Sequence, residues 1–231
     1  MIVPPSSRET RESLTLLAIV AVALFASGIA PRERGTWVLE TLPVFIAAPL
    51  LWLTWDRFRL TPLAYRLIFL HALILILGGA YTYAHVPLGF WLQDLFGFAR
   101  NPYDRIGHFA QGFVPAILAR EILLRRSPLV PGKWLFFLVC CVCLAISACY
   151  EFLEWWSAVI LGEGAKEFLG TQGDEWDTQW DMFLALIGAI TRRCLDLSTA
   201  RGARCASPAA RPRRAGRRPR GRNRRPPPAA R

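Results

Sequence analysis

The feature that most constrains this chain is a series of long apolar runs. Four of them, at Leu14–Ala30, Trp37–Trp55, Leu60–Ala80 and Trp134–Leu161, have about the 20 mostly apolar residues that a membrane-spanning helix requires. The chain is 53% hydrophobic and 19% charged, whereas a soluble domain usually has about 25% charged residues. The sequence therefore predicts an all-α, polytopic membrane helix bundle. It argues against a soluble enzyme, a disordered chain and a disulfide-rich secreted module.

Two weaker segments bring the expected number of transmembrane helices to about six. The fourth, Ile106–Leu124, is the most polar, and an aromatic stretch before it, residues 81–105, is predicted to be a loop or short helix at the membrane interface. The sixth begins near Trp176, but its apolar part, residues 182–190, is too short to cross a bilayer. We therefore expect the sixth helix to be truncated.

A strongly basic tail follows this incomplete helix. Residues 191–231 contain 14 arginines and one acidic residue, Asp196, whereas residues 1–190 contain 14 basic and 16 acidic side chains. The tail alone thus accounts for the net charge of +11, and the rest of the chain gives no indication of nucleic-acid binding. Two interpretations stay open: a reading-frame shift after Ile190, or a basic disordered tail lying on anionic lipid.

Charge also predicts the orientation of the chain. With residues 1–13 in the cytoplasm, the predicted inside segments contain seven Lys and Arg residues and the outside loops five, and cytoplasmic loops carry the excess of these residues. The predicted organisation is a cytoplasmic N-terminus (1–13), a transmembrane helical domain (14–190) and the basic tail (191–231).

Polar residues inside these helices are candidates for a site, because a charge at the bilayer centre costs about 2.5–3.5 kcal/mol on insertion scales. In the fourth span, His108 and Gln111 share one helix face, and Asp104 lies one turn before the histidine, where it can orient the imidazole. The alternative is that Asp104 caps the helix and His108 only hydrogen-bonds a neighbouring helix.

Acidic residues form two further groups. Glu151 and Glu154 are three residues apart, so both carboxylates lie on one face of the fifth helix. Two such carboxylates do not both ionise cheaply, and they are suited to acid/base chemistry or to sharing a cation. Asp177 and Asp181 lie at the start of the sixth helix, where the helix dipole offers a purely structural explanation.

Alternating helix directions bring these groups to one side of the membrane. The fourth and sixth helices start where the fifth ends, so the three groups are predicted to line one cavity near the outer face. A cavity of this kind suits a membrane-embedded enzyme, and the predicted roles follow: His108, Glu151, Glu154 and Asp104 catalytic, Arg105 and Gln111 in substrate binding, and Asp177 and Asp181 as ligands of a divalent metal.

Two long motifs occur in this chain, Tyr103–Phe109 and Leu169–Asp174, the latter followed by Trp176–Gln179. With these motifs, roughly residues 30–190 resemble the YjdF-type bacterial inner membrane proteins. The resemblance implies a multi-pass protein of the bacterial inner membrane and brings no assigned reaction. Members are expected to complete the last helix, and this chain departs from that pattern after Ile190.

A second, weaker resemblance is to the VanZ-like family, which is associated with glycopeptide resistance and the cell envelope. Its pattern is matched by Asp104, Arg105 and His108, by Glu151, and by Asp181 with Gly188. The Asn expected four residues after the last Asp is absent, because position 185 is Ala185.

Three functions remain open at this point. The first is an enzyme in the membrane that acts on a lipid or envelope precursor. The second is a small transporter or proton-coupled permease that uses the same residues as a relay. The third is a non-catalytic envelope factor whose polar cluster holds helices together. Membrane lipids are the expected partners in each case, and the sequence gives no indication of the oligomeric state.

Overall fold

A computed structural model describes residues 7–161, 169 and 171–206, with side chains for 7–160, 169 and 171–192. Every regular element in these ranges is helical, which confirms the predicted all-α class. The elements are α1 (Ser7–Ile29), α2 (Arg34–Thr54), α3 (Pro62–Tyr81), the short 3-10 helix η1 (Tyr83–His85), α4 (Pro87–Phe96), α5 (Tyr103–Arg126), α6 (Lys133–Leu161) and α8 (Asp177–Ala206). The chain divides into two compact units, residues 1–196 and 197–231, and the packing below is that of the first.

Four of the described helices are long and apolar enough to cross a membrane. They are α1, α2, α3 and α6, and they match the four strong runs of the sequence. Helices α5 and α8 have 24 and 30 residues and correspond to the weaker fourth and sixth segments. They are as long as the four apolar helices, and charged and polar residues lower their hydropathy. These residues include His108 and three arginines near the end of α5, and Asp181 and four arginines in α8.

Helix α8 continues past the point where its apolar sequence ends. The apolar run stops at Ile190, whereas the helix extends to Ala206, within the region predicted as a basic tail. The rest of that predicted tail, residues 207–231, lies outside the described residues. The frame shift and the lipid-bound tail both stay predictions.

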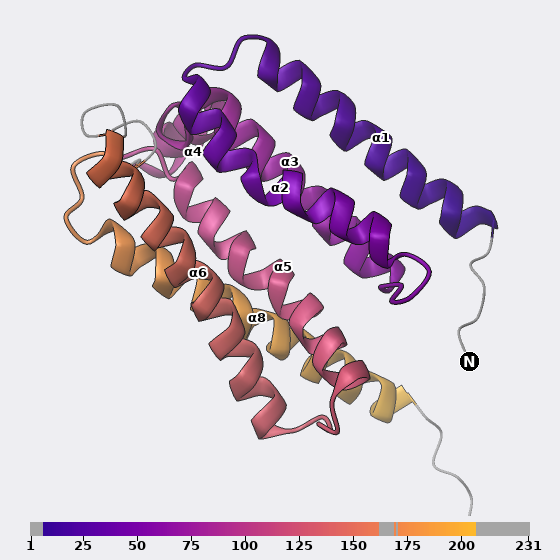
Figure 1. Cartoon of the computed structure of the whole chain (residues 1–231). Coiled ribbons are helices and arrows are strands. Elements are labelled where there is room, and N and C mark those ends of the chain that lie inside the picture. Colours follow the sequence, from indigo (N-terminus) through magenta and orange to yellow (C-terminus); the bar gives the residue numbers. More distant parts are fainter. Residues whose placement is uncertain (1–6, 162–168, 170, 207–231) are drawn as a thin grey trace, which may run out of the picture. The chain divides into compact units, whose positions relative to one another are not determined.

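Two groups of helices meet along α3 and α5. Helix α3 contacts α1, α2 and α5, and α5 also contacts α6 (Figure 1). One buried cluster joins α1, α2 and α3 to Tyr83 and Tyr103. A second joins α5, α6 and α8 through small side chains that include Ala116, Cys143 and Ala189. Small residues allow helices to approach closely where lipid provides no hydrophobic driving force.

The predicted interfacial stretch forms η1 and α4. Pro87 occupies the first turn of α4, and Gly97 ends the helix in the left-handed conformation (φ 67°), which glycine adopts without a steric cost. Phe90, Trp91 and Phe96 are exposed on it. A short amphipathic helix with exposed aromatic residues agrees with the predicted interfacial position.

Helices α5 and α8 touch backbone to backbone at two glycines. A Cβ atom added to Gly112 would overlap the carbonyl group of Ala185, and one added to Gly188 would overlap the backbone of Phe109 and Phe113. This close approach brings the start of α8 against the start of α5, where the polar residues lie.

We expect Gly188→Leu to destabilise the protein by about 1–3 kcal/mol, because overpacking forces the two backbones apart. The measurement is the thermal midpoint of the purified protein in detergent. Gly132→Ala is the matched control, since a Cβ at that position has only ordinary contacts. Equal midpoints for the two variants would contradict the close packing of α5 on α8.

Candidate functional site

The candidate site lies at one end of the helix bundle, called here the polar end. It is formed by the first turns of α5 and α8 and by the last turns of α6, and Figure 1 shows these three helix ends on the same side. Alternating helix directions produce this arrangement, as the sequence predicted. Asp104, His108, Glu151 and Asp181 are all buried there.

His108 is at the centre of the site. Its Nδ1–H donates a hydrogen bond to Oε1 of Gln111 over 2.8 Å, which leaves Nε2 directed at carboxylates from two helices. Nε2 lies 3.4 Å from Oδ1 of Asp104 and 3.7 Å from Oδ2 of Asp181. A histidine with one nitrogen held by a hydrogen bond and the other facing acidic groups has the arrangement of a typical metal ligand.

Two groups of potential ligands share this histidine. One consists of Asp104, His108 and Asp181, and the other of His108, Glu151 and Glu154. Within each group the ligand atoms lie within 4.8 Å of one another. The structure thus brings together five of the residues predicted for the site.

Two of these carboxylates are not satisfied by the protein itself. Within the described part of the chain, neither carboxylate oxygen of Glu151 makes a hydrogen bond, and Oδ1 of Asp181 also makes none. The side chain of Thr178, on α8, also lies beside Glu151. Because a buried carboxylate without a partner is costly, these oxygens are suited to sharing a proton or a cation.

Arg100 pairs with three acidic residues of the polar end. Its Nη1 lies 2.6 Å from Oδ1 of Asp177 and 3.6 Å from Oδ2 of Asp174, and its Nη2 lies 3.5 Å from Oδ2 of Asp104. Nη1 also donates to the carbonyl oxygen of Thr171. Asp177, predicted as a metal ligand, therefore pairs with an arginine and belongs to neither group of potential ligands.

A reciprocal pair of amide hydrogen bonds fixes the segment before α8. Gln172 accepts from the backbone N–H of Asn101 and donates to its carbonyl oxygen, both over 3.0 Å. The Asn101 side chain, which is fully buried, donates to Val86 and accepts from the N–H of Tyr103. These contacts hold the loop before α8 against the start of α5.

Arg105 lies at the edge of the polar end. Its Nη2 donates to Oδ2 of Asp174 over 3.1 Å, and its guanidinium lies over the ring of Trp180. Arg105 does not line the cavity described below, whereas Gln111 does. The substrate-binding roles predicted for both residues stay predictions.

One acidic residue of this region was not predicted from the sequence. Glu40 of α2 is buried, and the hydroxyl of Tyr150 donates to its Oε2 over 3.0 Å. The sequence did contain a signal for it, since Glu40 is the sole acidic residue in the apolar run Trp37–Trp55. The cost of burying a charge in a membrane applies to Glu40 as it does to the other acidic residues. Arg100 was also missed, although it precedes Asp104 by one helical turn.

A cavity of about 540 Å³ opens from the polar end into the bundle. Glu40, Asp104, His108, Tyr150 and Glu154 line its polar end, and the rest of the lining is mainly aliphatic, with His71 of α3 and Arg126 of α5 among the exceptions. A volume of this size lies within the range of roughly 300–1,000 Å³ that is typical of ligand sites.

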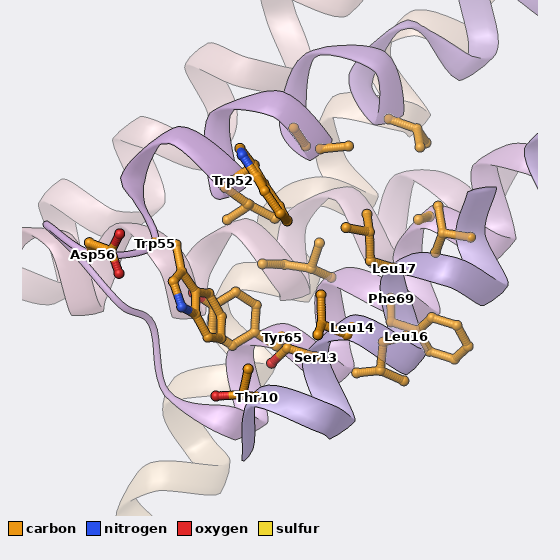
Figure 2. Close-up of a pocket in the computed structure, with 17 residues that line it drawn as sticks. Thr10, Ser13, Leu14, Leu16, Leu17, Trp52, Trp55, Asp56, Tyr65 and Phe69 are labelled. Atoms are coloured by element: carbon orange, nitrogen blue, oxygen red, sulfur yellow. The ribbon is translucent and has the colours of Figure 1, made fainter. Parts of the chain in front are cut away.

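A second cavity, of about 380 Å³, lies among α1, α2 and α3 (Figure 2). Its lining includes Leu14, Leu17, Trp52 and Phe69, and its single ionisable carboxylate, Asp56, is exposed. It therefore lacks the buried acidic groups and the histidine that make the polar end chemically distinctive.

Comparison with known proteins assigns the chain to a family. The family described as "Predicted membrane protein (DUF2238)" matches residues 12–199. The chain belongs to this family. It is also 56% identical, over 179 residues, to the "Inner membrane protein YjdF" of Escherichia coli (strain K12), a match that covers 78% of this chain and 84% of that protein. No solved structure matches the chain.

These matches confirm the predicted YjdF-type resemblance. Together with the four apolar helices, they show a membrane protein related to an inner membrane protein. The VanZ-like resemblance and the cytoplasmic N-terminus stay predictions.

We expect Arg100→Gln to lower stability by about 3–5 kcal/mol, because it leaves buried carboxylates of Asp104 and Asp177 without their counter-charge. The measurement is thermal unfolding in detergent, with Arg34→Gln, which removes an exposed arginine, as the control. Adding Asp177→Asn to Arg100→Gln should recover part of the loss. Simple additivity of the two single changes would contradict the ion pair.

Proposed function

We propose that the protein is a membrane-embedded enzyme that acts on a lipid or cell-envelope precursor, using a divalent cation held at His108. Asp104 and Asp181 supply the carboxylate ligands, and Glu151 with Glu154 forms an acid/base pair next to the cation. The observation that carries this proposal is the direction of Nε2 of His108, which faces carboxylates 3.4 and 3.7 Å away while Nδ1–H is engaged by Gln111.

The charge balance supports a cation rather than an anion at this point. Around His108 lie four buried or half-buried carboxylates, of Asp104, Glu151, Glu154 and Asp181, and Arg100 contacts only Asp104 among them. One histidine with several carboxylates is a donor set suited to Zn²⁺, Mn²⁺ or Mg²⁺. Such an ion supplies a Lewis acid that polarises a carbonyl or phosphoryl oxygen.

The unsatisfied oxygens of Glu151 support its separate role. A carboxylate that the protein leaves without hydrogen bonds, beside the carboxylate of Glu154, is suited to take up and release a proton. With the N-terminus in the cytoplasm, the site lies toward the outer leaflet. A lipid-linked precursor reaches such a site by diffusing within the membrane.

A metal analysis of the full-length protein tests this proposal. We expect the wild type purified in detergent to contain a divalent metal, and both His108→Ala and Asp181→Asn to lose most of it. Glu151→Gln should retain the metal, because Glu151 is assigned to proton transfer. Asp94→Asn, which changes an exposed acidic residue, is the control.

The same variants separate the proposal from its alternatives. In a strain lacking the gene, a Glu151→Gln variant that is abundant and metal-loaded but does not restore the wild-type phenotype supports the enzyme. A wild-type protein without metal, whose stability does not respond to a chelator, contradicts it. Loss of membrane abundance in all three site variants would favour the structural role of the polar cluster.

We further expect Gln111→Ala to weaken metal affinity roughly 10–100-fold, because it removes the group that orients the His108 ring. Metal titration followed by the thermal midpoint measures the change, since a bound ligand stabilises the folded state in proportion to the logarithm of its concentration. Gln93→Ala, a change outside the site, should leave the titration unaltered. Unchanged affinity in Gln111→Ala would show that this hydrogen bond does not organise a metal ligand.

A further inference from the structure

The larger cavity extends far beyond the polar end. Its lining includes both Asp104, in the first turn of α5, and Arg126, the last residue of that helix. At a rise of about 1.5 Å per residue, the part of α5 between them is about 33 Å long. This is close to the hydrocarbon thickness of a bilayer, about 30 Å. The cavity is therefore a groove that follows α5 across the membrane.

The groove is apolar along most of its length. Beyond the polar end its walls are formed mainly by aliphatic side chains, among them Val44, Ala47, Leu75, Val114 and Leu118. Protein interiors are close-packed, and cavities with aliphatic walls do not hold water well. A space of about 540 Å³ with such walls requires an apolar occupant.

The rim of the groove indicates where that occupant enters. Three residues that line the groove are exposed: Leu50 of α2 (56%), Ile122 of α5 (46%) and Ile146 of α6 (41%). These residues belong to helix segments of a membrane protein, so their exposed surface faces hydrocarbon. An aliphatic rim admits a lipid chain from the side, whereas a water-soluble solute would have to leave water to pass it.

We propose that this groove binds the hydrocarbon chain of a lipid and holds its head group at His108. The proposal deepens the proposed function and rests on it for the chemistry at the polar end. It names the substrate class as a lipid with a long chain. It also makes Leu118, about two-thirds of the way along α5, a residue that determines which chains fit. The chain enters sideways between α2 and α5, and its polar end reaches the carboxylates and the histidine.

The excess of acidic groups defines the head group. Glu40, Asp104 and Glu154 line the cavity together with two histidines, His71 and His108. A head group that carries an ammonium group complements this surface directly, and its phosphate can be accepted by a cation at His108. Phosphatidylethanolamine has both groups and is the probe used in the test.

The test is photo-crosslinking of the full-length protein in nanodiscs that contain phosphatidylethanolamine with a diazirine in the middle of one acyl chain. We expect peptides from the walls, around Leu118 and Ala47, to be labelled. The labelling should saturate at a low fraction of probe and be competed by unlabelled phosphatidylethanolamine. Leu118→Trp, which fills the groove, should reduce this labelling at least fivefold.

Leu70→Trp is the matched control, because Leu70 of α3 is exposed and does not line the groove. It should leave the saturable labelling unchanged. Ala47→Leu, a milder narrowing of the groove from α2, provides a second variant if Leu118→Trp does not fold. Metal content and thermal midpoint establish in each case that the polar end is intact.

Two results would overturn the proposal. One is labelling that rises linearly with the probe and is equal in Leu118→Trp, which is the behaviour of bulk lipid around any membrane protein. The other is rapid reaction of Leu118→Cys with a charged, water-soluble maleimide, which would show a water-filled path.

The two proposals fail separately. Saturable labelling in a protein that binds no metal would refute the metal-dependent function and leave the lipid groove standing. A metal-loaded protein without saturable labelling would refute the groove alone.

Discussion

Placing carboxylates where water does not reach is the constraint on which the rest of this structure depends. A buried charge without a partner is costly, and the two sides of the polar end differ in how far the protein offsets this cost. Arg100 neutralises one side of the cluster through Asp177, Asp174 and Asp104. The other side, around His108, has no such cation within the described residues, and the oxygens of Glu151 make no hydrogen bond there. This asymmetry is the physical basis of the proposed site.

Close backbone contact between helices, rather than packing of large side chains, holds the residues of the polar end in place. Gly112 and Gly188 let the backbones of α5 and α8 touch, which fixes Asp181 opposite His108. The paired amides of Asn101 and Gln172 fix the preceding loop in the same register. A rigid polar end next to an apolar groove is suited to a molecule with a polar head group and an apolar chain. A membrane lipid has both.

Much of the site followed from helical periodicity and from the alternation of spans. Asp104 and His108 are four residues apart on one helix, so their proximity was predictable from the sequence. The meeting of Glu151 with Asp181 was predictable because α6 ends where α8 starts. Glu40 was missed because it stood alone in its run, and its partner Tyr150 is 110 residues away. Asp177 could not be separated from Asp181 by sequence, since only the position of Arg100 distinguishes them.

The sequence by itself determined that this chain forms membrane-crossing helices and which side chains the membrane penalises, because hydropathy and helical period act locally along the chain. The order and direction of the helices also determined that the acidic groups and the histidine lie at the same end of the bundle. The tertiary structure alone decided which carboxylates pair with Arg100, which face Nε2 of His108, and that a groove runs from them along α5. These depend on the distances between side chains of different helices, and such distances are set by how closely the helices pack.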